Sequence, residues 1–242
     1  MRLVLLCCVQ LATAEWRANS TVGFSPRRRT QVLDFSGGGL SDGGGVGAGD
    51  TGAASSPAPG KALDFSARDG KLWANNKLFH VKGINWYGSE GRTGAPTGLH
   101  KHSIDWYVDL LADNGFNALR LLFNHESVLA DGPIETLDVR FSPQLYGMTY
   151  LEMFAEIADR AARRGLLVMM ACHRLNPTAW PGDGKWYDRT ITEQKVMQSW
   201  DKVARKLCSR WNVFAVDLQN EPHASSWAKN SATDWNKARA SP

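Results

Sequence analysis

The chain has 242 residues, of which 43% are hydrophobic, 10% aromatic and 21% charged. This composition is typical of a globular protein with a substantial core, and it excludes a wholly disordered, collagenous or coiled-coil chain. The net charge of +4 is too small to indicate a nucleic-acid partner. The cysteines number only four, so a disulfide framework does not hold the fold together.

Residues 1–14 have the features of a signal peptide. Arg2 supplies a positive start, residues 3–12 form an apolar stretch too short to span a bilayer, and Ala12-Thr13-Ala14 resembles a cleavage site. We therefore expect cleavage near Ala14 and secretion to the extracellular space. The alternative is a buried first strand or helix. No other stretch is apolar for long enough to suggest a membrane span.

Residues 15–62 have the composition of a disordered linker. Ten of the 23 glycines lie between Gly37 and Gly60, mixed with serine, alanine, aspartate and proline. Such a segment cannot bury enough apolar surface to offset the loss of chain entropy. We therefore expect one folded domain, residues 63–242, behind a disordered extension.

From residue 63 onward, strand and helix patterns alternate. A hairpin turning at residues 74–77 leads into a strand at 82–86. Further apolar strands are predicted at 118–123, 166–172 and 213–218, and amphipathic helices at 104–113, 148–164 and 192–210. This alternation predicts a parallel sheet covered by helices. Because no glycine-rich phosphate loop follows the first strand, we favour an α/β fold of the (β/α) TIM-barrel type over a dinucleotide-binding sheet.

Polar side chains stand at three of the predicted strand ends. Arg120 lies on the second strand, His173 ends the third, and Asn220-Glu221-Pro222 follows the fourth. Each of these residues taken alone has a structural explanation, such as an ion pair or a helix cap. Functional groups of a (β/α) barrel gather at the carboxyl ends of its strands, so the three together indicate a catalytic site.

These residues resemble a known family. The triplet Asn220-Glu221-Pro222, Arg120, His173 and the segment Gly83-Ile84-Asn85-Trp86 together resemble glycoside hydrolase family 5, the cellulase family of clan A. The resemblance covers about residues 68–240. The run 217–223, Asp-Leu-Gln-Asn-Glu-Pro-His, is similar to the endoglucanase branch of that family.

The resemblance implies a retaining hydrolysis of β-1,4-glucosidic bonds, with a β-glucan polysaccharide or oligosaccharide as the partner. Retaining glycosidases use two carboxyl groups about 5–5.5 Å apart, one as acid/base and one as nucleophile. By this match Glu221 is the acid/base, Asn220 binds the sugar 2-hydroxyl, Arg120 holds the nucleophile and His173 contacts sugar hydroxyls or the catalytic pair. The match implies no cofactor, and the spacing of the histidines indicates no metal site.

Aromatic side chains near the predicted strand ends are candidates for stacking on sugar rings. Trp86 and Tyr87 follow the first strand, and Trp180 and Trp186 lie in the loop after the third. For each of them, packing within the protein is an equally good explanation.

The sequence departs from the family pattern in two ways. Ala171 stands where the family has an aspartate on the third strand, so that strand supplies no acidic partner for His173. Strands 5–8 and the nucleophile glutamate are missing, and the loop residues Glu90, Glu126 and Glu135 are not placed to replace it. We therefore expect a fragment, unstable or dimeric and inactive by itself.

Two other functions stay open on the sequence. One is a secreted carbohydrate-binding protein without turnover, and the other is a family relative that acts on mannan or another β-glycan. If the signal peptide is removed, Cys172 and Cys208 are left either as one disulfide or as two free thiols.

Overall fold

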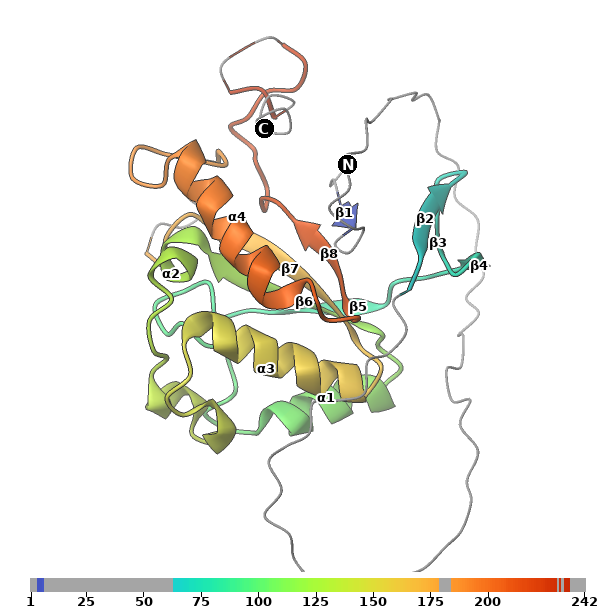
Figure 1. Cartoon of the computed structure of the whole chain (residues 1–242), viewed down its shortest axis with the longest axis vertical. Coiled ribbons are helices and arrows are strands. Elements are labelled where there is room, and N and C mark those ends of the chain that lie inside the picture. Colours follow the sequence, from blue (N-terminus) through green and yellow to red (C-terminus); the bar gives the residue numbers. More distant parts are fainter. Residues whose placement is uncertain (1–3, 7–62, 179–183, 230, 232, 236–242) are drawn as a thin grey trace, which may run out of the picture.

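The main sheet of the protein is built from four parallel strands in chain order. The computed structural model describes residues 4–6, 63–178, 184–229, 231 and 233–235 (Figure 1). The sheet has the order β1-β8-β7-β6-β5. Its parallel strands are β5 (Gly83–Trp86), β6 (Ala118–Asn124), β7 (Leu167–Arg174) and β8 (Val213–Asp217). Each lies beside the strand that precedes it in the chain, as helical crossover connections require. The predicted parallel sheet is confirmed.

The three long helices begin at side-chain caps. In α1 (Ile104–Asp113), the Ser103 hydroxyl accepts a hydrogen bond from the backbone N–H of Trp106. Thr149 forms a capping box with Glu152 at the start of α3 (Tyr150–Arg163). The Thr192 hydroxyl caps α4 (Glu193–Leu207). Each cap satisfies a backbone donor that the first helical turn leaves without a partner.

Three short helices lie in the connection from β6 to α3. They are α2 (His125–Ala130) and the 3-10 turns η1 (Thr136–Val139) and η2 (Pro143–Leu145). The sequence predicts a helical region at Ser142-Pro143 but neither α2 nor η1. A helix of six residues, which follows directly on a strand, is too short to show a helical period.

The two faces of the sheet have different surroundings. Leu119, Leu121 and Phe123 on β6 belong to the larger hydrophobic core with Phe154 and Ile157 of α3. Figure 1 shows α1, α3 and α4 on this one side of the sheet. The alternation of side chains along a strand sends the intervening residues, including Arg120, to the other face.

A small antiparallel sheet packs against the start of the parallel strands. It consists of β2 (Phe65–Arg68), β3 (Lys71–Ala74) and β4 (Lys77–Leu78), which confirms the predicted hairpin. Phe79 from this unit packs with Ala118, Leu167 and Phe214 in a second apolar cluster. The cluster lies at the amino ends of the strands, which leaves the carboxyl ends open for polar side chains.

Little of the predicted N-terminal extension lies in the described part of the chain. The strand β1 (Val4–Leu6) falls within the predicted signal peptide and pairs antiparallel with β8. The rest of residues 1–14, and the predicted linker at 15–62, lie outside the described residues. The signal peptide and the linker therefore remain predictions.

The buried side chain of Asn212 joins α3 and β7 ahead of β8. Its Nδ2 donates to the carbonyl oxygens of Ala158 at 2.8 Å and Leu166 at 3.0 Å. We expect Asn212→Ala to lower the free energy of unfolding by about 1–3 kcal/mol, because two buried carbonyl oxygens each lose one hydrogen bond. Urea denaturation measures this change. Asn114→Ala, which removes one exposed hydrogen bond to Leu110, is the control and should cost less than about 1 kcal/mol. Equal losses in the two variants would contradict the prediction.

Candidate active site

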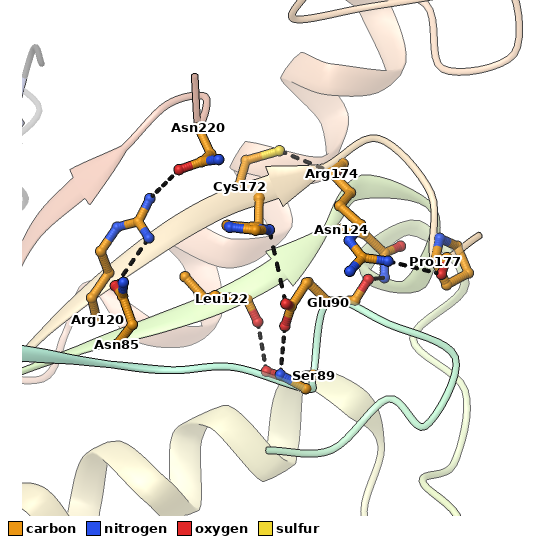
Figure 2. Close-up of polar contacts among 12 residues, drawn as sticks. Asn85, Ser89, Glu90, Arg120, Leu122, Asn124, Cys172, Arg174, Pro177 and Asn220 are labelled. Carbon is orange, nitrogen blue, oxygen red and sulfur yellow. Dashed lines mark hydrogen bonds and ion pairs between the residues drawn. The ribbon is translucent and has the colours of Figure 1, made fainter. Parts of the chain in front are cut away.

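Arg120 connects three strands of the sheet through its guanidinium group. Its Nη2 lies 2.5 Å from Asp217 Oδ2, at the end of β8, and its Nε donates to the same oxygen at 3.2 Å. Nη1 donates to Asn85 Oδ1 on β5 at 3.0 Å, and Nη2 donates to Asn220 Oδ1 at 3.2 Å (Figure 2). The side chains of Arg120 and Asp217 are only 13% and 8% exposed. Charges this deeply placed need such partners, because desolvation of an unpaired one costs several kcal/mol.

The segment Asn220-Glu221-Pro222 is held at the carboxyl end of the sheet. The backbone N–H of Asn220 donates to the Cys172 carbonyl oxygen on β7 at 2.8 Å. Glu221 is exposed and has a φ of +45°, a left-handed conformation that is costly for a residue with a side chain. Its carbonyl oxygen accepts a hydrogen bond from the His223 N–H at 2.6 Å. Strained backbone of this kind is concentrated at functional sites.

His173 lies at the end of β7 and faces an acid that the sequence analysis set aside. Its Nδ1 is 3.8 Å from Oε1 of Glu90, and the two side chains are 13% and 5% exposed. The predicted strand-end residues thus come from the carboxyl ends of neighbouring strands or from the face of the sheet opposite the helices. They are Arg120, His173, Asn220 and Glu221. The sheet also borders a hollow of about 310 Å³ that reaches Asn85 and Arg120 but is lined toward the amino ends of the strands by Gly83, Ala118 and Phe214.

The predicted stacking residues have different surroundings. Tyr87 is 62% exposed, but Trp86 is only 7% exposed, and its Nε1 donates to the Thr97 carbonyl oxygen at 2.9 Å. Trp186 is 5% exposed and packs against Tyr187 and Trp235. Both Trp86 and Trp186 are thus buried in this structure, which favours the packing explanation that the sequence left open beside stacking. Trp180 lies outside the described residues.

Trp227, which the sequence analysis did not single out, presents an aromatic ring to solvent. It is 50% exposed, and its ring centroid lies 6.2 Å from that of the buried Trp235. An exposed tryptophan that rests on a second ring is suited to stacking on the apolar face of a sugar. Its position six residues after Glu221 was the signal available in the sequence.

Cys172 and His125 form a buried contact beside the site. The Cys172 Sγ lies 3.1 Å from His125 Nε2, and His125 Nδ1 is 2.8 Å from the Ser199 hydroxyl. Burial lowers the pKa of His125 to about 3. Burial and the Asp217 carboxylate raise the pKa of the Cys172 thiol well above its usual value. Both groups are therefore uncharged at neutral pH, and Cys172 is not an activated nucleophile. Because Cys172 is a free thiol, the disulfide with Cys208 that the sequence left open is not formed.

The site is built from a guanidinium, amides, an imidazole and carboxylates, which are groups that bind hydroxyls and transfer protons. Within the part of the chain that the structure describes, no three histidine, cysteine, aspartate or glutamate side chains are arranged to hold a metal ion.

Comparisons with known proteins assign this arrangement to a family. The family model described as cellulase (glycosyl hydrolase family 5) matches residues 77–241, a range that contains every described site residue above. The chain therefore belongs to glycosyl hydrolase family 5. The solved structures that it resembles are TIM barrels, and its alternating parallel strands and helices match about half of such a chain.

Individual relatives agree with this assignment. An endoglucanase of Paenibacillus polymyxa is 28% identical over 64% of this chain and 39% of the relative. The major extracellular endoglucanase of Xanthomonas campestris is 29% identical over 75% of this chain and 38% of the relative. A solved Pyrococcus horikoshii endocellulase with cellotetraose has 27% identity and a TM-score of 0.66, covering 75% of this chain and 53% of that one. The chain thus spans about two fifths of the length of the two endoglucanases.

The Arg120–Asp217 pair should contribute strongly to stability. We expect Asp217→Asn to lower the free energy of unfolding by about 3 kcal/mol, because it leaves the buried guanidinium without a countercharge. Urea denaturation measures the loss. The matched control is Asp201→Asn, since Asp201 pairs with Arg205 at the surface, where the side chains are 57% and 78% exposed. The control should show no measurable change. A stable Asp217→Asn variant would contradict the prediction.

His125 should make stability depend on pH. Its pKa is about 3 in the folded chain and about 6.5 when unfolded, so the unfolded chain binds more protons between these values. The contribution of neutral His125 to the free energy of unfolding is complete above pH 6.5. It is lost as the pH falls toward 3, by up to about 1.4 kcal/mol per pH unit. We expect His125→Asn to show a correspondingly shallower decline in the free energy of unfolding as the pH falls from about 6.5 to about 4. Parallel profiles for the two proteins would show that the prediction is wrong.

Proposed function

We propose that this chain carries the acid/base half of a retaining endo-β-1,4-glucanase site. The observation that carries the proposal is the position of Glu221 at the end of β8, directly after Asn220, whose side chain accepts a hydrogen bond from Arg120. Membership of a cellulase family and similarity to named endoglucanases support a cellulose-like substrate. The Pyrococcus endocellulase forms a complex with cellotetraose, which supports a cello-oligosaccharide as the partner of this chain.

Each described residue has a part in this proposal. Glu221 protonates the leaving glycosidic oxygen and later takes a proton from water. Asn220 donates an amide hydrogen to the sugar 2-hydroxyl while Arg120 occupies its Oδ1, which fixes which end of the amide faces the sugar. Tyr87 and Trp227 supply exposed rings for stacking, and His173 binds a sugar hydroxyl.

The proposal also includes an expectation for the chain by itself. A retaining mechanism needs a second carboxylate about 5–5.5 Å from the first. Among the described residues no ion pair or hydrogen bond joins the Glu221 carboxylate to another side chain, and Asp217 is engaged with Arg120. We therefore expect this chain by itself to bind glucan without hydrolysing it.

Export of the protein belongs to the same proposal. The apolar segment 3–12 and the Ala12-Thr13-Ala14 site are the support in the sequence, and the Xanthomonas relative is named as extracellular. No helix within the described ranges has the length and apolarity needed to cross a membrane.

A titration with cellotetraose tests the binding part. We expect saturable binding that Glu221→Gln preserves, because the shape of the side chain is kept. Asn220→Ala should weaken the affinity about three- to tenfold through the loss of one hydrogen bond. Isothermal titration calorimetry measures both, with Asn114→Ala on the far end of α1 as the control that should bind like the natural chain. Tighter binding of mannotetraose would favour a mannan-active relative, and no binding of either sugar would refute the proposal.

Release of reducing sugar from carboxymethylcellulose is the companion measurement. We expect none from the chain alone. Release that Glu221→Gln abolishes would overturn the expected inactivity and support the acid/base role. Release that persists in Glu221→Gln would overturn that role.

A further inference from the structure

A buried acid outside the predicted strand ends lies next to the site. Glu90, in the loop between β5 and α1, is 4% exposed. Its Oε2 accepts a hydrogen bond from the backbone N–H of Gly88 at 2.7 Å. Burying a charged carboxylate costs several kcal/mol of desolvation free energy unless its oxygens have partners. The partners of both Glu90 oxygens therefore indicate what this residue does.

The loop that carries Glu90 is fastened to the carboxyl ends of the sheet. Asn124 Nδ2, at the end of β6, donates to the Glu90 carbonyl oxygen at 3.1 Å. The Ser89 hydroxyl donates to the Leu122 carbonyl oxygen at 2.6 Å, and the Tyr150 hydroxyl donates to the Ser89 carbonyl oxygen at 2.6 Å. These contacts come from β6 and α3 and hold the loop from two sides; Figure 2 shows the one between Ser89 and Leu122.

The second carboxylate oxygen of Glu90 faces His173. The distance from Oε1 to Nδ1 is 3.8 Å, which is an ion-pair contact and longer than a hydrogen bond. A carboxylate on this side of the ring favours a proton on Nδ1, whether the ring is neutral or charged. In a neutral ring, Nε2 is then the acceptor. Such contacts in a free site commonly shorten when a substrate binds.

We propose that Glu90 is a positioning residue of the glucan site. Its carboxylate holds the proton of His173 on Nδ1 and orients the ring, so that Nε2 accepts a hydrogen bond from a sugar hydroxyl. This proposal rests on the proposed function for its effect on glucan binding. It also explains how His173 is oriented although β7 has Ala171 in place of an acidic residue: the charge comes from the loop after β5 and not from β7.

The tautomer of His173 tests the proposal without reference to activity. Long-range ¹H–¹⁵N NMR of the full chain at alkaline pH, where the ring is neutral, distinguishes a proton on Nδ1 from one on Nε2, and the His173 signals are those lost in His173→Gln. We expect the Nδ1–H form in the natural chain and a loss of this preference in Glu90→Gln. The matched control is Glu135→Gln, because Glu135 is exposed and makes no side-chain cap contact; it should leave the tautomer unchanged.

Two results would overturn the proposal: an Nε2–H tautomer in the natural chain, or the same tautomer preference in Glu90→Gln. The tautomer of His173 in the natural chain tests the proposal even if Glu90→Gln does not fold. In the cellotetraose titration, Glu90→Gln should bind about three- to tenfold more weakly, the effect of one weakened hydrogen bond, and Glu135→Gln should bind normally. A natural chain that binds no cellotetraose refutes the proposed function, while the tautomer still supports or overturns the role of Glu90.

Discussion

The arrangement of this site depends on one buried guanidinium group. Arg120 stands on β6 and reaches Asn85 on β5, Asp217 on β8 and Asn220 just after β8. Its rigid fork of donors directs each of these contacts at a fixed angle, which a lysine ammonium would not do. The negative charge of Asp217 makes the burial of Arg120 tolerable, and the remaining donors then fix the amides next to Glu221.

A second set of contacts places the imidazole. The loop after β5 brings Glu90 beside His173 and is held there by groups from β6 and α3. Two carboxylates, Asp217 and Glu90, are thus each paired with a cation or an imidazole, and neither is available as a nucleophile. Glu221, by contrast, is exposed and has a left-handed backbone conformation. The nearby Cys172–His125 contact is uncharged and supports the core.

The sequence predicted the parallel sheet, the main helices and the strand-end residues, because these depend on local patterns. Ser103, Thr149 and Thr192 lie at the starts of α1, α3 and α4, and the apolar runs coincide with β6, β7 and β8. It missed α2, which is too short for a period, and it left open whether Trp86 and Trp186 stack on sugars or pack within the protein, where both are buried. The exposure of a tryptophan depends on what packs over it, and a single sequence does not record this.

The sequence by itself determined where the polar groups stand along the chain, since a residue at the end of an apolar strand lies at the edge of the sheet. Only the tertiary structure decided which of them meet. Arg120 and Asp217 are 97 positions apart, and the partner of His173 comes from a loop rather than from its own strand. The physical reason is that hydrogen bonds and ion pairs act over a few ångströms of space, whereas a sequence pattern specifies only spacing along one element.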